Sequence, residues 1–116
     1  MDEITIYGIK NCDTMKKAFK WLDEHNIEHA FHDYKKQGVD LTILEQAIRE
    51  HGWEVVINKR GTTWRQLDDD IKHSMTDKSA LNIAQKNSSI IKRPLLSVNE
   101  KIFVGFKAED YQTIFG

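Results

Sequence analysis

The chain has one cysteine, Cys12, and its thiol is the side chain best suited to covalent chemistry. It lies in the polar segment Asn11-Cys12-Asp13-Thr14. Residues 4–8, just before this segment, alternate in the manner of a short strand, and residues 15–22, just after it, repeat their apolar positions at helical spacing. We therefore expect the thiol where a strand passes into a helix.

A helix start favours the reactive thiolate form of a cysteine. The first N–H groups of a helix are unpaired, and its peptide dipoles place positive charge at this end. Lys10, Lys16 and Lys17 add positive charge close to Cys12 in the sequence. A solitary cysteine is most often a small buried apolar residue, but a polar and basic turn favours a nucleophile.

Two arginines are further candidates for a functional site. Arg60 follows Lys59 in a loop rich in glycine and threonine, and Arg93 precedes the only proline, Pro94, where backbone freedom is small. A guanidinium presents a planar fork of donors that suits oxyanions and carboxylates. Two arginines that converge on a thiolate would form an anion site, although spacing in the sequence does not establish that they converge.

Other reactive residue types have simpler explanations. His25, His29 and His32 straddle a predicted helix end and a strand of alternating faces, which is poor spacing for a metal site. The acidic run 68–70 is typical of a solvated turn and helix cap. The chain has no glycine-rich phosphate loop. We assign no metal and no bound cofactor.

Length and charge limit the classes of protein that the chain can represent. Its 116 residues suit one domain, 1–116, and its 17 basic and 18 acidic residues give a net charge of −1. This balance argues against a protein that coats nucleic acid or anionic membrane. One cysteine excludes an intrachain disulfide and suits a reducing compartment. We expect a soluble, cytoplasmic protein with no nucleic-acid or membrane partner.

The hydrophobic periodicity predicts an α/β chain in the order βαβ, a helical middle, ββ and α. A strand, a helix and a strand in succession imply a parallel crossover. Asp13 or Thr14 is expected to cap the first helix, and Thr76 a later one. Residues 53–70 lack a clean period and are a candidate functional loop between short helices. The predicted strands are 4–8, 27–34, 95–98 and 101–105, and the predicted helices begin near residues 13, 41, 77 and 108.

Three segments together resemble a known family. They are Gly8-Ile9-Lys10-Asn11-Cys12-Asp13-Thr14-Met15-Lys16-Lys17, Asn58-Lys59-Arg60-Gly61-Thr62-Thr63-Trp64-Arg65 and Ile91-Lys92-Arg93-Pro94-Leu95. In this order they are similar to the ArsC/Spx/YffB family of thioredoxin-fold proteins, most closely to its YffB branch, over essentially the whole chain. The resemblance implies a thioredoxin-like fold of βαβ and ββα units, with a mixed four-stranded sheet and a helical insertion at roughly residues 40–90.

The resemblance also implies roles for individual residues. Cys12 matches the family's reactive cysteine, and Arg60 and Arg93 match the two arginines that surround the thiol in the glutathione-coupled arsenate reductases. A cis peptide bond before Pro94 is implied as well, although only about 5–6% of X–Pro bonds are cis. The residues expected to bind substrate or glutathione are Lys10, Asn11, Thr14, Arg60, Arg93 and Pro94.

Two departures from the family pattern narrow the expected function. Residues 95–107 lack the third arginine of the arsenate reductases, and residues 13–15 lack the second cysteine of the Spx redox switch. We therefore expect a glutathione-dependent thiol–disulfide oxidoreductase, in which Cys12 forms a mixed disulfide that glutathione resolves. One alternative is reduction of a small oxyanion, arsenate, coupled to glutathione and glutaredoxin. The other is an Spx-like RNA polymerase-binding regulator without a redox switch.

Overall fold

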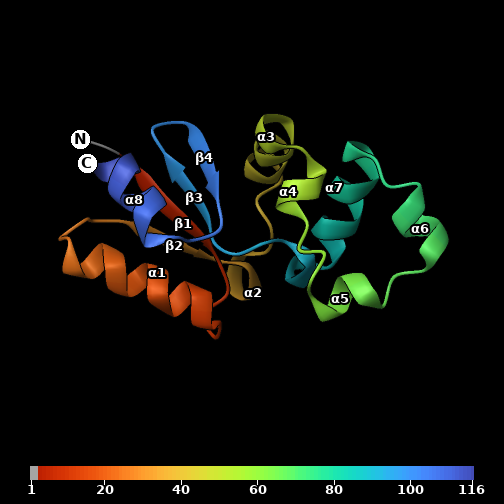
Figure 1. Cartoon of the computed structure of the whole chain (residues 1–116), viewed down its shortest axis with the longest axis horizontal. Coiled ribbons are helices and arrows are strands. Elements are labelled where there is room, and N and C mark those ends of the chain that lie inside the picture. Colours follow the sequence, from red (N-terminus) through yellow and green to blue (C-terminus); the bar gives the residue numbers. More distant parts are fainter. Residues whose placement is uncertain (1–2) are drawn as a thin grey trace. The chain divides into compact units, whose positions relative to one another are not determined.

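The computed structural model describes residues 3–116, which divide into two compact units (Figure 1). The first combines the described part of Met1–Gln37 with Arg93–Gly116 and contains the sheet. The second, Gly38–Lys92, is helical, and the insertion expected at roughly residues 40–90 lies within it. Cys12 and Arg93 therefore belong to the first unit, and Arg60 to the second.

The sheet of the first unit has the strand order β2-β1-β3-β4. Its central strand β1 pairs in parallel with β2 and antiparallel with β3, and β3 pairs antiparallel with β4. This is the predicted mixed sheet of βαβ and ββα units. The strands are β1 (Ile4–Gly8), β2 (Ala30–Asp33), β3 (Leu95–Val98) and β4 (Lys101–Val104).

The second strand is shorter than the predicted 27–34. Its residues 30–33 pair with β1, whereas the Ile27 N–H donates back to the Leu22 carbonyl at the end of the preceding helix (2.9 Å). Tyr34 already begins the short helix α2 (Tyr34–Gln37). Alternation of side chains therefore overestimated the strand, because only residues opposite β1 gain ladder hydrogen bonds.

The first helix, α1 (Asp13–Glu24), has Cys12 rather than Asp13 or Thr14 at its N-cap. Cys12 has an extended backbone (φ −147°, ψ 128°), and its carbonyl accepts the Lys16 N–H at 3.0 Å. Asp13 is thus the first helical residue, where a carboxylate is favoured by the dipole. The prediction of a cap at Asp13 or Thr14 is wrong, and the thiol lies nearer the helix end than expected.

Gly8 allows α1 to approach the end of β1 closely. A Cβ atom placed on Gly8 would lie 2.5 Å from Met15 Sδ and 2.8 Å from Met15 Cε. Met15 is fully buried, so its thioether has little room to move away. Gly8 therefore helps to fix where the chain turns from the strand into Cys12.

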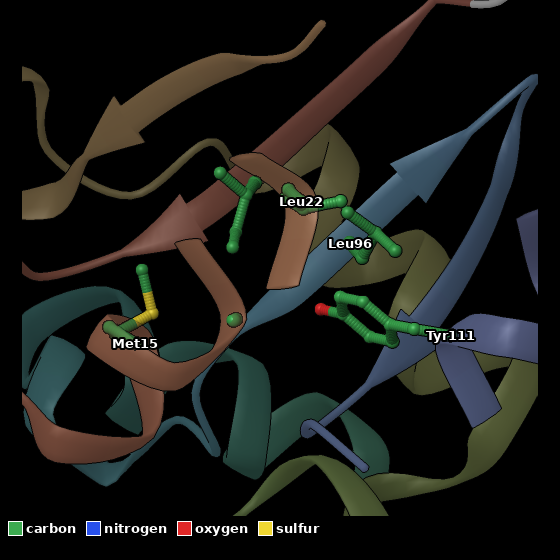
Figure 2. Close-up of a cluster of buried hydrophobic side chains, with 6 residues drawn as sticks. Met15, Leu22, Leu96 and Tyr111 are labelled. Atoms are coloured by element: carbon green, nitrogen blue, oxygen red, sulfur yellow. The ribbon is translucent and has the colours of Figure 1, made fainter. Parts of the chain in front are cut away.

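A buried apolar cluster joins α1, the sheet and the last helix, α8 (Ala108–Phe115) (Figure 2). Because full burial of a large apolar side chain such as Leu, Ile or Met contributes about 1.5–3 kcal/mol, this cluster holds both helices against the sheet. Its members are Ile6, Met15, Ala18, Leu22, Leu96 and Tyr111.

The predicted hairpin is confirmed, and Asn99 and Glu100 connect its two strands with positive φ angles of 49° and 72°. Two consecutive residues of this kind form the turn that matches the twist of a two-stranded ribbon. The turn returns β4 alongside β3.

The two longest helices of the helical unit begin at N-cap residues whose side chains accept backbone hydrogen bonds. Asp40 Oδ1 accepts the Ile43 N–H (3.2 Å), and Thr76 and Ser79 form a capping box, as expected of a helix start at Thr76. No helix in residues 3–116 is long and apolar enough to cross a membrane. The elements are α3 (Leu41–His51), α4 (Trp53–Val56), α5 (Thr62–Arg65), α6 (Asp69–His73), α7 (Asp77–Lys86) and the 3-10 helix η1 (Ser88–Ile90).

Tyr111 provides a stability test of the apolar cluster. Its side chain is only 1% exposed, and its hydroxyl has no hydrogen-bond partner among the described residues. Because an unsatisfied buried hydroxyl costs about 1–3 kcal/mol, Tyr111→Phe is expected to raise the free energy of unfolding by about 1 kcal/mol. Thermal denaturation should show an increase of about 4 °C in Tm, and a decrease would mean that the hydroxyl is satisfied.

The same variant should differ from the wild type in alkaline solution. Burial raises the pKa of the Tyr111 phenol above its ordinary value of 10.0. A group whose pKa is higher in the folded state contributes stability below its unfolded pKa, and this stability is lost as the pH rises. Above about pH 10, urea unfolding should therefore show a steeper fall in stability for the wild type than for Tyr111→Phe.

Candidate active site

Cys12 lies half-buried at the N-cap of α1, and its side chain packs against the apolar cluster. It accepts no capping hydrogen bond from the first turn, and among residues 3–116 no hydrogen bond joins its sulfur to Thr14. The positive end of the helix and the neighbouring lysines therefore act on the sulfur through space. The sulfur is therefore not held by a direct hydrogen bond from the helix start.

Arg93 and Pro94 lie at the same end of the sheet as the Cys12 turn. Tyr7 of β1 pairs with Leu95, the first residue of β3, so the segment before β3 leaves the sheet where the segment after β1 does. The Arg93–Pro94 peptide bond is cis, as the family resemblance implies. Pro94 is buried, and its carbonyl accepts the Gly105 N–H at 2.8 Å. The sheet thus brings half-buried Arg93 to the end at which Cys12 lies.

A cavity of about 480 Å³ opens beside the Cys12 turn. Two residues of its wall, Lys10 and Asn11, directly precede Cys12 and were expected to bind substrate. Three other residues with the same expected role do not line this cavity: Thr14, Arg93 and Pro94. The remaining wall residues come from α1, β2 and α2. The complete lining is Lys10, Asn11, Lys16, Phe19, Phe31, Asp33, Lys36 and Gln37.

Arg60 lies in a tight turn of the helical unit. Asn58 Oδ1 accepts the Arg60 N–H (3.2 Å), and the Asn58 carbonyl accepts the Gly61 N–H (3.3 Å). The Asn58 N–H in turn donates to the Ile90 carbonyl at 2.8 Å, which ties the turn to η1. The backbone of this turn is ordered, while the Arg60 side chain is exposed and pairs with no other residue in 3–116.

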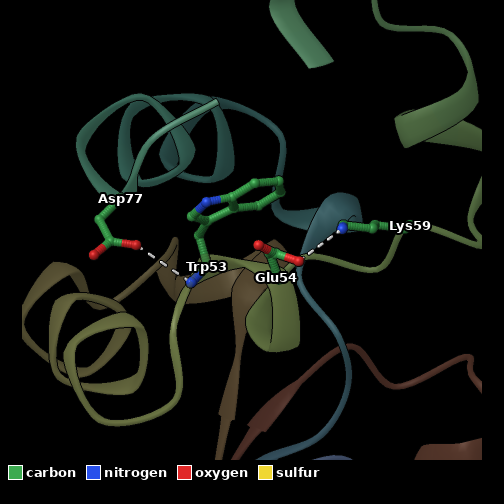
Figure 3. Close-up of polar contacts among 4 residues, drawn as sticks. All are labelled: Trp53, Glu54, Lys59 and Asp77. Atoms are coloured by element: carbon green, nitrogen blue, oxygen red, sulfur yellow. Dashed lines mark hydrogen bonds and ion pairs between the residues drawn. The ribbon is translucent and has the colours of Figure 1, made fainter. Parts of the chain in front are cut away.

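Lys59, next to Arg60 in the turn, contacts residues of α4. Its Nζ atom lies 3.3 Å from Glu54 Oε2 and 4.8 Å from the Trp53 ring centroid (Figure 3). The Trp53 ring stacks on the Trp64 ring with centroids 6.0 Å apart, and the backbone N–H of Trp53 donates to Asp77 Oδ1 at 3.3 Å. Lys59 is therefore held by a carboxylate and an aromatic face, whereas the Arg60 guanidinium has no such partner among residues 3–116.

The three neighbouring histidines make local contacts. His25 stacks on Trp21 with ring centroids 3.8 Å apart, and His29 Nδ1 lies 2.9 Å from the Ile27 carbonyl. His32 lies against Tyr7, with centroids 5.1 Å apart. Within residues 3–116, no group of three or more His, Cys, Asp or Glu side chains is arranged to hold a metal ion.

The cavity residues that follow β2 were not predicted from the sequence. Gly8 pairs with Asp33 in the parallel ladder, so α2 begins beside the segment that leads to Cys12. The carboxyl ends of neighbouring parallel strands are a common place for ligands. The basic and polar run Lys35-Lys36-Gln37 after a predicted parallel strand was the signal that could have pointed to this wall.

The mixed four-stranded sheet with its helices is a thioredoxin-like fold, and Cys12 lies at the start of its first helix. The solved structure of the YffB protein matches this chain with a TM-score of 0.93 and 43% identity, over 97% of this chain and 99% of that one. The ArsC family model matches residues 7–114. The chain belongs to the ArsC family.

Curated relatives extend along nearly the whole chain. An uncharacterized protein of Haemophilus influenzae is 51% identical over 112 residues, which cover 97% of this chain and 98% of that protein. Global transcriptional regulator Spx 1 of Oceanobacillus iheyensis is 27% identical over 109 residues, or 92% of this chain and 82% of the regulator. The chain is therefore similar to a YffB protein, to an uncharacterized protein and to a transcriptional regulator.

The placement of Cys12 predicts that the thiol of the folded protein can be modified. Cys12 is the only cysteine of the chain, and it is half-buried rather than fully buried. Iodoacetamide should therefore add one carbamidomethyl group per folded chain, at Cys12, and should leave Cys12→Ser unmodified. Intact-mass spectrometry measures the addition, and a wild-type protein that reacts only after unfolding would contradict an accessible nucleophile.

Proposed function

We propose that the protein is a glutathione-dependent thiol–disulfide oxidoreductase. The observation that supports this most directly is the placement of Cys12, the only cysteine, at the N-cap of α1 and next in sequence to Asn11 of the cavity wall. The thiolate attacks one sulfur of a disulfide substrate, and the S–S bond breaks. The departing sulfur takes the electron pair and a proton from water. Cys12 then holds the other half as a mixed disulfide.

Resolution of this mixed disulfide requires a thiol from outside the chain. No second cysteine is present to attack it. A glutathione thiolate therefore attacks the sulfur bound to Cys12, forms a new disulfide with that half, and releases Cys12 as thiolate. Glutathione supplies the electrons as co-substrate, and no bound cofactor is needed. This chemistry fits a reducing compartment such as the cytoplasm.

The two arginines are proposed to bind anionic groups. Arg93, at the Cys12 end of the sheet, would stabilise the thiolate and hold a carboxylate. Arg60 would bind a carboxylate of the co-substrate with its unpaired guanidinium. Pro94 is fully buried, so it would position Arg93 through the backbone rather than contact the substrate. Thr14, half-buried in the first turn, is proposed to contact the bound co-substrate rather than to cap the helix.

Two other functions remain as alternatives. In the first, the same thiolate attacks arsenate, with glutathione and glutaredoxin as reductants; membership of the ArsC family supports it, and the lack of an arginine in residues 95–107 weighs against it. In the second, the chain binds RNA polymerase as a regulator, which the similarity to Spx 1 supports. The absence of a nucleic-acid or membrane partner remains a prediction.

One set of assays separates the three functions. Purified protein is incubated with glutathione and 2-hydroxyethyl disulfide, and separately with arsenate, glutathione and glutaredoxin. We expect turnover in the first assay and its loss in Cys12→Ser, because serine is a poor nucleophile without an activating base. Turnover only with arsenate would support the reductase alternative, and no turnover in either assay would support the regulator.

Replacement of the arginines by lysine tests whether the site recognises geometry as well as charge. Arg60→Lys and Arg93→Lys keep the charge but lose the planar fork that binds a carboxylate bidentately. Each should weaken binding of glutathione by about 1.5–3 kcal/mol, with little change in Tm. Calorimetric titration with glutathione and with arsenate measures the loss for each ligand.

Arg49→Lys is the matched control, because Arg49 is an exposed arginine of α3 with no proposed role. Its affinity for glutathione should equal that of the wild type. If Arg60→Lys and Arg93→Lys also keep wild-type affinity, the two arginines are ordinary surface residues and their proposed roles are wrong.

A further inference from the structure

The cavity beside Cys12 has an excess of positive charge. Lys10, Lys16 and Lys36 line it with one carboxylate, Asp33, so three positive charges against one negative leave a net charge of +2. None of the three ammonium groups has a hydrogen bond or ion pair with another residue in 3–116. Unpaired cations around a concave surface attract an anion.

Two polar residues of the wall are held in place by the backbone. Gln37 Oε1 accepts the Asp33 N–H at 3.2 Å, which leaves the amide nitrogen of Gln37 as a donor. Asp33 Oδ1 accepts the Lys35 N–H at 2.9 Å, and Asp33 is only 8% exposed. The start of α2 is therefore fixed, and Lys36 and Gln37 with it.

Two aromatic rings form the apolar part of the cavity. Phe19 of α1 and Phe31 of β2 meet edge to face with centroids 5.0 Å apart, and both pack against the apolar cluster. Such a pair is a rigid surface for methylene groups. The cavity thus combines an apolar wall with cationic donors, which suits a flexible organic acid better than a small inorganic oxyanion.

We propose that this cavity binds a terminal carboxylate of glutathione, with Lys16, Lys36 and Gln37 as residues that select an acidic thiol. The identity of the ligand rests on the proposed function. Asn11, in the wall, is the residue before Cys12, and consecutive Cα atoms are about 3.8 Å apart. Each carboxylate-bearing end of glutathione is likewise one residue from its sulfur, so a sulfur at Cys12 leaves a carboxylate within reach of the cavity.

Binding of a non-reducible analogue tests this proposal without turnover. S-methylglutathione is titrated into the wild type, Lys16→Gln and Lys36→Gln, and amide chemical shifts are followed by NMR. We expect saturable shifts at Phe31, Asp33 and Gln37, and an increase in Kd of about three- to tenfold in each variant, since an exposed cation contributes less than a buried one. Lys20→Gln, on an exposed α1 lysine that does not line the cavity, should change Kd by less than about 1.5-fold.

The diethyl ester of S-methylglutathione identifies the recognised group. The diester lacks both carboxylate charges, so the wild type should bind it with a higher Kd than it binds the acid. The Kd of Lys36→Gln for the diester should equal that of the wild type. Dipeptide analogues that lack either the glycyl or the γ-glutamyl residue show which carboxylate enters the cavity.

Failure of this proposal is distinguishable from failure of the proposed function. No saturable binding to the wild type, shifts remote from the cavity, or an equal Kd in Lys16→Gln and Lys36→Gln would overturn the cavity assignment, whatever the turnover assay gives. Cavity binding that depends on the lysines, together with no glutathione-dependent turnover, would leave the assignment in place and contradict the oxidoreductase function.

Discussion

The pairing of the central strand β1 with both of its neighbours is the constraint on which the candidate site depends. Gly8 lies opposite Asp33 of β2, and Tyr7 lies opposite Leu95 of β3. Three chain segments therefore meet at one end of the sheet: the turn to Cys12, the start of α2, and Arg93–Pro94. A one-residue slip in either pairing would turn the paired side chains to the other face of the sheet and separate these segments.

The apolar cluster gives this arrangement its rigidity. Ile6 and Leu96 of the sheet, Met15 and Leu22 of α1, and Tyr111 of α8 are buried together, and Cys12 packs at their edge. Since Gly8 lets Met15 approach the strand closely, the position of the thiol follows from core packing rather than from a hydrogen bond to its sulfur. A nucleophile held in this way keeps its sulfur available to an incoming disulfide.

Local sequence signals predicted much of the fold. The alternation in residues 4–8, the Thr76 cap and the hairpin turn at Asn99 and Glu100 each depend on neighbouring residues, and each prediction is confirmed. The bounds of β2 and the N-cap of α1 were wrong because pairing with β1 and the extended backbone of Cys12 decide them. The order of the family's motifs, rather than periodicity, indicated the thioredoxin-like fold and the cis bond before Pro94.

The candidate site was only partly predictable, because some of its residues are brought together by strand pairing rather than by adjacency in the sequence. Cys12, Lys10 and Asn11 are adjacent in sequence, so one motif identified them together. Lys36 and Gln37 reach the same cavity through the parallel register of β2, so the basic and polar run that contains them is informative only together with that pairing. Arg60 lies in the helical unit, and its role stays a prediction from the family resemblance and its own ordered turn.

The central claim is that Cys12 forms a mixed disulfide which an external thiol resolves. Intact-mass spectrometry of the protein after incubation with oxidised glutathione tests it most directly. We predict one glutathionyl adduct per chain, located at Cys12 by peptide mapping and removed by reduced glutathione with recovery of the free thiol. The absence of an adduct at neutral pH, or an adduct that reduced glutathione does not remove, would contradict this account.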